Sequence, residues 1–129
     1  MAANKVLLID DDEDFVAIHK AYLERAGFVV SACYSGDDGL DAARTEHPDV
    51  VVLDFMMARP TEGSLVAQAL RDDPVLKTTP IILLTSVRAK HPWWGVQQDG
   101  DYLPVDILLD KPIEPERLVA EIRQLVSQK

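Results

Sequence analysis

The chain has 129 residues, a length that fits one domain over residues 1–129 and is too short for two independent cores. Hydrophobic residues make up 47% of the sequence and charged residues 27%, which is typical of a soluble globular protein and not of a disordered chain. Thirteen basic and 22 acidic side chains give a formal net charge of −9, which argues against direct binding to the phosphate backbone of a nucleic acid.

Membrane insertion and disulfide bonding are also disfavoured by the sequence. No apolar run is long enough to cross a bilayer, and residues 1–5 lead into a strand without the pattern of a signal peptide. We therefore expect a cytoplasmic protein. Cys33 is the only cysteine, which excludes an internal disulfide, and its apolar surroundings predict a buried structural thiol.

Apolar runs alternate with amphipathic segments along the chain, a pattern that predicts strands interleaved with helices in a mostly parallel sheet. Residues 6–9 form a continuous apolar run, as expected of a central strand covered on both faces, and the run ends at Asp10. The apolar positions of the following helix recur at helical spacing: Phe15, Ile18, Tyr22 and Leu23. Gly27 is the natural stop of this helix.

The next strand is expected over residues 28–33. A second helix opens at Ser35 or Gly36, and His47 followed by Pro48 marks its end. The histidines at positions 19, 47 and 91 each stand alone in the sequence, so we expect surface or packing roles for them.

The third strand covers residues 50–53 and ends, like the first, in a carboxylate, Asp54. A third helix is predicted near residues 62–71. Its buried side is expected to consist of Leu65, Val66 and Leu70. The fourth strand, residues 81–84, ends in Thr85.

Between residues 87 and 104 the helical pattern fails. Helix-breaking residues interrupt this stretch at Pro92, Gly95, Gly100 and Pro104, which predicts an irregular or shortened fourth helix. A fifth strand at 105–109 leads to Lys111 and Pro112. The last helix, about 114–127, is expected to bury four apolar side chains: Leu118, Ile122, Leu125 and Val126.

The polar residues at the strand ends predict a functional site. In an open parallel sheet, ligands bind beyond the carboxyl ends of the strands, at the point where the strand order reverses. If the order is 2-1-3-4-5, the first and third strands are neighbours there. Five side chains would then face one edge of the sheet: Asp10, Asp11, Asp54, Thr85 and Lys111.

Three carboxylates brought together repel one another unless a cation neutralises them. Their oxygen atoms, without a cysteine or histidine in the set, predict Mg²⁺ or Mn²⁺ and argue against zinc. Such an ion, with Lys111 beside it, would bind phosphoryl oxygens and offset charge during attack by a carboxylate on phosphorus.

Four motifs occur in register over nearly the whole chain, and together they resemble the receiver domains of bacterial response regulators, the CheY-like superfamily of two-component signalling. The motifs cover residues 6–11, 48–54, 82–86 and 109–112. The resemblance implies a flavodoxin-like, doubly wound α/β fold. It also implies that Asp54 accepts a phosphoryl group from a sensor histidine kinase or a phosphotransfer protein, and that the chain switches a downstream protein target or output domain without being an enzyme that turns over a substrate.

The resemblance assigns a role to each site residue. Asp54 is the phosphoacceptor, Asp11 is a metal ligand, and Asp10 is a metal-site carboxylate that acts largely through water. The main-chain carbonyl of Met56 would complete the coordination by the protein.

The other two side chains would contact the phosphoryl group. Thr85 would bond one phosphoryl oxygen and report phosphorylation, and Lys111 would pair with another. The Lys111–Pro112 peptide bond is expected in the cis form. One departure from the family pattern concerns the switch, because Leu108 occupies the position where an aromatic residue often moves together with the threonine.

Two alternatives remain open at this point. Asp10 to Asp12 could be the Asp-x-Asp motif of a small phosphohydrolase of the haloacid-dehalogenase type, although the expected Thr or Val after the second Asp is missing. The chain could also be a protein-binding module that keeps the receiver fold and signals without phosphate.

Overall fold

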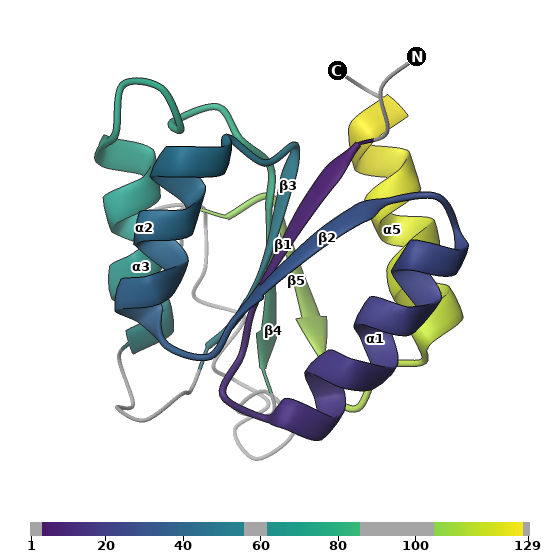
Figure 1. Cartoon of the computed structure of the whole chain (residues 1–129). Coiled ribbons are helices and arrows are strands. Elements are labelled where there is room, and N and C mark those ends of the chain that lie inside the picture. Colours follow the sequence, from purple (N-terminus) through teal and green to yellow (C-terminus); the bar gives the residue numbers. More distant parts are fainter. Residues whose placement is uncertain (1–3, 56–61, 86–104, 128–129) are drawn as a thin grey trace.

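The computed structural model describes residues 4–55, 62–85 and 105–127 (Figure 1). Within these residues, five parallel strands form one sheet in the order β2-β1-β3-β4-β5, which confirms the predicted topology. The strands are β1 (Lys5–Ile9), β2 (Val29–Cys33), β3 (Val50–Asp54), β4 (Ile81–Thr85) and β5 (Ile107–Asp110). The helices are α1 (Glu13–Arg25), α2 (Gly36–Glu46), α3 (Glu62–Asp72) and α5 (Pro115–Ser127).

Helices cover both faces of the sheet, α1 and α5 on one face and α2 and α3 on the other (Figure 1). The alternation of side chains along β1 separates two apolar layers. Val6 and Leu8 pack into the layer under α1 and α5, whereas Leu7 and Ile9 pack into the layer under α2 and α3. Coverage of both faces explains why the central strands are continuous apolar runs.

Short polar residues fix the beginnings of two helices. The Asp12 carboxylate accepts hydrogen bonds from the backbone N–H groups of Asp14 and Phe15, both at 3.1 Å, and caps α1. Ser35 caps α2 by accepting a bond from the Asp38 N–H at 3.2 Å. Gly36 is therefore the first helical residue, and Ser35 is the cap that precedes it.

The two predicted helix stops are confirmed. Gly27 follows the end of α1 with a φ of 103°, in the left-handed region that glycine adopts without a Cβ penalty. His47 ends α2 with a φ of 51°.

The predicted buried side of α3 is wrong at one position. Leu65 is 59% exposed, while Val66 is 3% exposed and Ala67 and Leu70 are fully buried. Positions 63, 66, 67 and 70 form the stripe that faces the sheet, and residue 65 lies about 100° away from residue 66 around the helix, toward solvent.

In helix α1 the buried face also differs from the one that the apolar spacing indicated. Ile18 is 51% exposed, although its spacing suggested an apolar stripe, and His19 lies in the buried stripe with Val16 and Leu23. The expected packing role of His19 is thus observed. Cys33 is partly buried and not fully buried, and burial is the main cause that raises the pKa of its thiol.

Two further expectations concern the second half of the chain. Strand β5 begins at Ile107, two residues later than predicted. The irregular fourth helix falls on residues 86–104, which lie outside the described residues, and it stays a prediction. In the described part of the chain, no helix combines the length and the apolar character needed to cross a membrane.

Candidate functional site at the carboxyl edge of the sheet

Strand register brings two carboxylates side by side. Ile9 of β1 pairs with Leu53 of β3, and each of these residues is followed by an aspartate, Asp10 and Asp54. Because the two strands are parallel neighbours, both aspartates emerge at the same edge of the sheet.

The carboxylates of Asp10, Asp11 and Asp54 form a cluster in which one oxygen from each lies within 4.8 Å of the others. Asp10 is 3% exposed and Asp54 is 6% exposed, whereas Asp11 is open to solvent. The three carboxylates that the sequence placed at this edge therefore meet, with those of Asp10 and Asp54 buried and that of Asp11 at the surface.

Lys111 reaches this cluster from the loop between β5 and α5. Its Nζ lies 2.8 Å from Oδ2 of Asp10 and 3.5 Å from Oδ1 of Asp54. The lysine backbone is held in place because its N–H donates to the carbonyl of Thr85 at 2.9 Å. The Lys111–Pro112 peptide bond is cis, as the resemblance implied.

The charge of the site is unbalanced. Burial disfavours the charged form of Lys111, but the hydrogen bond to Asp10 and the charges of Asp54 and Asp10 outweigh it and raise the pKa of the lysine. Three carboxylates face one ammonium group, so an excess of two negative charges remains when all four groups are ionised. This excess and the all-oxygen donor set fit a hard divalent cation such as Mg²⁺.

The other acidic residues that follow β1 belong to the helix. Asp12, Glu13 and Asp14 are exposed, and they form the cap and the first turn of α1, where negative charge is favoured. The Asp12 N–H also donates to Oδ1 of Asp10 at 2.9 Å. Both carboxylate oxygens of Asp10 are therefore engaged, one by this N–H and one by Lys111.

Two of the expected site residues remain to be placed. Thr85 ends β4, is 1% exposed, and pairs in register with Asp110 of β5, directly before Lys111. Met56, whose main-chain carbonyl was expected to face a cation, lies outside the described residues.

Sequence reasoning missed an aromatic support beneath Lys111. The lysine Nζ lies 4.4 Å from the centroid of the Phe15 ring, and this ring stacks on the imidazole of His19 at 3.9 Å. The spacing of four between residues 15 and 19 indicates that they lie on one side of a helix, but it does not pair Phe15 with Lys111.

Gly63 is a second residue whose role was missed. Its N–H donates to the Phe55 carbonyl at 3.1 Å, and a Cβ at this position would collide with the backbone of Asp54 and Phe55. Only glycine lets α3 begin this close to the strand end that carries Asp54.

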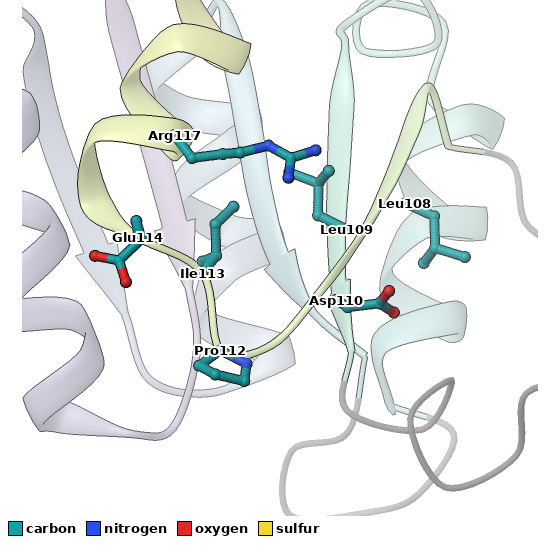
Figure 2. Close-up of a pocket in the computed structure, with 7 residues that line it drawn as sticks. All are labelled: Leu108, Leu109, Asp110, Pro112, Ile113, Glu114 and Arg117. Carbon is teal, nitrogen blue, oxygen red and sulfur yellow. The ribbon is translucent and has the colours of Figure 1, made fainter.

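A surface hollow of about 490 Å³ lies beside the segment that carries Lys111 (Figure 2). Figure 2 shows Leu108 and Asp110 on one side of β5 and Leu109 on the side of α5. The hollow is lined by residues 108–110, 112–114 and 117, so it does not include the carboxylate cluster. The charged cluster, and not this hollow, is the candidate site.

Comparison with known proteins agrees with this geometry. Residues 6–123 match the family described as "Response regulator receiver domain". The chain is 30% identical over 124 residues to the alkaline phosphatase synthesis transcriptional regulatory protein PhoP of Bacillus subtilis, covering 96% of this chain and 49% of PhoP. It is 27% identical to the polar-differentiation response regulator DivK of Brucella ovis, covering 95% of both chains.

A solved structure shares the fold at similar identity. The chemotaxis response regulator CheY4 of Vibrio cholerae superposes with a TM-score of 0.83 at 27% identity, over 96% of this chain and 99% of that chain. The present chain spans about half the length of PhoP. From the family match over residues 6–123 and these similarities, the chain belongs to the response regulator receiver domain family of two-component signalling.

Proposed function

We propose that this receiver domain accepts a phosphoryl group on Asp54 from a histidine kinase or a phosphotransfer protein, in a reaction that depends on Mg²⁺ or Mn²⁺. The observation that carries the proposal is the position of the Asp54 carboxylate. It lies at the end of β3, close to the carboxylates of Asp10 and Asp11 and 3.5 Å from the Lys111 ammonium.

The hydrogen bonds of Asp10 argue against Asp10 as the nucleophile. Both oxygens of Asp10 are engaged, one by Lys111 and one by the Asp12 N–H, which leaves Asp10 poorly placed to attack phosphorus. This arrangement, together with the family membership, argues against the phosphohydrolase alternative that used Asp10.

In the proposed reaction, one carboxylate oxygen of Asp54 attacks the phosphorus and forms an acyl phosphate. The bond from phosphorus to the donor nitrogen breaks, and the electron pair stays on the donor imidazole. Lys111 would pair with one phosphoryl oxygen, and the Thr85 hydroxyl would bond to another. Both groups act at the atoms where negative charge gathers during transfer.

Asp11, Asp54 and the main-chain carbonyl of Met56 are the proposed direct ligands of the divalent cation, and Asp10 is the proposed metal-site carboxylate that acts largely through water. When bound, this cation would neutralise the carboxylates and offset the charge of the phosphoryl group being transferred. The carboxylate cluster, with its excess of negative charge, supports this assignment.

The proposed output is a change of conformation that a downstream protein or an attached output domain reads. Leu108 is partly buried and packs in the layer under α2 and α3. Because an aliphatic side chain cannot hydrogen-bond, any movement of Leu108 with Thr85 would be driven by packing alone. The domain would catalyse only its own phosphorylation and its slow dephosphorylation.

The test is intact-mass measurement after incubation with acetyl phosphate and Mg²⁺. The wild-type chain is expected to gain the mass of one phosphoryl group, and Asp54→Ala is expected to gain none. Asp38→Ala, which removes an exposed carboxylate on α2, is the matched control and should be labelled like the wild type. A wild-type chain without label would instead favour the module that signals without phosphate.

A further inference from the structure

The proposed site leaves two residues of α1 without an assigned role, Phe15 and His19. Phe15 is partly buried, and its ring lies under the Lys111 ammonium with the Nζ 4.4 Å from the ring centroid. The imidazole of His19, which is only 4% exposed, stacks on the same ring at 3.9 Å with an interplanar angle of 24°. The Phe15 ring therefore lies between two groups, with the Lys111 ammonium near it and the His19 imidazole stacked on it.

His19 also connects α1 to the backbone that follows Lys111. Its Nδ1 lies 2.9 Å from the carbonyl of Phe15, and its Nε2 lies 3.4 Å from the carbonyl of Ile113. Ile113 comes two residues after Lys111. The imidazole therefore contacts both the helix that carries the aromatic ring and the loop that carries the lysine.

The distances around Lys111 indicate why a support is needed. The ammonium lies closer to Asp10, at 2.8 Å, than to Asp54, at 3.5 Å, so the carboxylates alone draw it away from the nucleophile. The lysine side chain is flexible, with four carbons between backbone and charge. An aromatic face attracts an ammonium group without fixing its direction, so it can hold the charge while the lysine changes partner.

We infer that Phe15 and His19 are positioning residues for Lys111. Phe15 supports the ammonium beside Asp54, and His19 fixes the Phe15 ring and the loop backbone after Lys111. This inference rests on the proposed transfer to Asp54. A divalent cation at the carboxylate cluster would weaken the attraction between Asp10 and Lys111. The Phe15 ring carries no net charge, so its contact with Lys111 would remain.

The first test measures the contact without any reaction. In the wild-type chain, the ring current of Phe15 should shift the ε-methylene NMR signals of Lys111 upfield. Phe15→Tyr keeps a ring and should keep this shift, whereas Phe15→Leu should abolish it. Unchanged Lys111 signals in Phe15→Leu would overturn the inference.

The second test measures initial rates of labelling by acetyl phosphate at saturating Mg²⁺. Phe15→Leu should lower the maximal rate about tenfold, the effect expected from loss of a partly desolvated cation–π contact. The Mg²⁺ concentration for half-maximal labelling should not change, because the three carboxylates remain. Phe15→Tyr should restore most of the rate.

His19 is tested by a pair of variants. A glutamine amide can reach as far as the imidazole Nε2, so His19→Gln should retain more of the rate than His19→Ala. Phe28→Leu is the control for general loosening, because Phe28 is buried in the same apolar layer as Val16 but makes no contact with Lys111 among those described. It should be less stable than the wild type and be labelled at the wild-type rate.

The outcomes separate this inference from the proposed function. If the wild type is labelled on Asp54 and Phe15→Leu is labelled equally fast, only the inference is overturned. If Phe28→Leu slows labelling as much as Phe15→Leu, loss of packing explains the effect and the inference is again overturned. A wild-type chain that takes no label would overturn both.

Discussion

Ion pairs occur at both ends of the sheet, but their charge balance differs. At the end where β4 and β5 begin, the guanidinium of Arg71 donates to the carbonyls of Lys77 and Thr79 and pairs with Asp106 at 2.7 Å. The same oxygen of Asp106 accepts the N–H of Ile81 at 2.7 Å. One cation here pairs with one anion, and backbone groups make further hydrogen bonds with both.

At the carboxyl edge, Lys111 pairs with Asp10 and Asp54, and these two carboxylates form a cluster with a third, that of Asp11. A balanced ion pair whose hydrogen bonds are made within the chain stabilises the fold. An excess of like charge destabilises the fold by mutual repulsion, and a bound cation relieves this repulsion. Four predictions test this distinction.

The largest effect is expected at the balanced pair. Arg71→Met removes the cation while Asp106 and two carbonyls remain, so we expect the free energy of unfolding to fall by about 2 kcal/mol. Urea denaturation measures it. Arg71→Lys keeps the positive charge but loses the forked geometry of the guanidinium, so its free energy of unfolding should lie between those of the wild type and Arg71→Met. If Arg71→Met does not lower the free energy of unfolding beyond experimental error, the balanced pair does not stabilise the fold.

Mg²⁺ is expected to stabilise the chain through the unbalanced site. At ten times its dissociation constant, a ligand that binds only the folded state adds about 1.4 kcal/mol to the free energy of unfolding. Thermal denaturation with and without Mg²⁺ measures the effect. Asp11→Ala should reduce it strongly, and Asp38→Ala should leave it unchanged. Equal stabilisation of all three proteins would mean that Mg²⁺ acts elsewhere.

The same substitution at the two edges should change stability in opposite directions. Asp54→Asn removes one of three mutually repelling carboxylates, so without divalent ions it should stabilise the fold by about 1 kcal/mol. Asp106→Asn weakens the balanced pair and should destabilise the fold. Denaturation in the presence of EDTA gives both values, and a shared sign would contradict the distinction.

The smallest effect concerns Asp73, in the turn between α3 and β4. The backbone N–H of Val75, opposed by burial and helped by the Leu76 N–H and Arg44, lowers the pKa of Asp73. A lowered pKa means that its contribution to stability is present above the ordinary carboxyl pKa of about 4 and is lost as the pH falls through the lowered value.

Asp73→Ala should therefore be less stable than the wild type at neutral pH, and the difference should shrink in acid. Denaturation midpoints between pH 7 and pH 2 measure it. A difference that is constant over this range would assign the effect of Asp73 to packing and not to its charge.

The meeting of the site carboxylates followed from the sequence because it depends on a single rule. The apolar runs of the first, third and fourth strands each ended in a polar residue, and parallel strands in the order 2-1-3-4-5 place those ends at one edge. No knowledge of helix rotation was needed to bring Asp10 and Asp54 together.

Helix rotation was harder to predict. Ile18 and Leu65 are apolar but exposed, since the faces of α1 and α3 are set by what packs against them and not by their own composition. The contact of Phe15 with Lys111 could not be found either, because it joins α1 to a loop 96 residues away whose path depends on the whole sheet.

The close approach of Gly63 to the Asp54–Phe55 backbone has a mechanical consequence. Helix α3 continues from Gly63 to Arg71, about 12 Å away at 1.5 Å per residue, and a hydrogen-bonded helix moves as a rod. A shift of the peptide after Asp54 would therefore move α3 along its axis and displace the Arg71 guanidinium, which pairs with Asp106 directly before β5. Helix α3 would in this way transmit a change at Asp54, at one end of the sheet, to the ion pair at the other end.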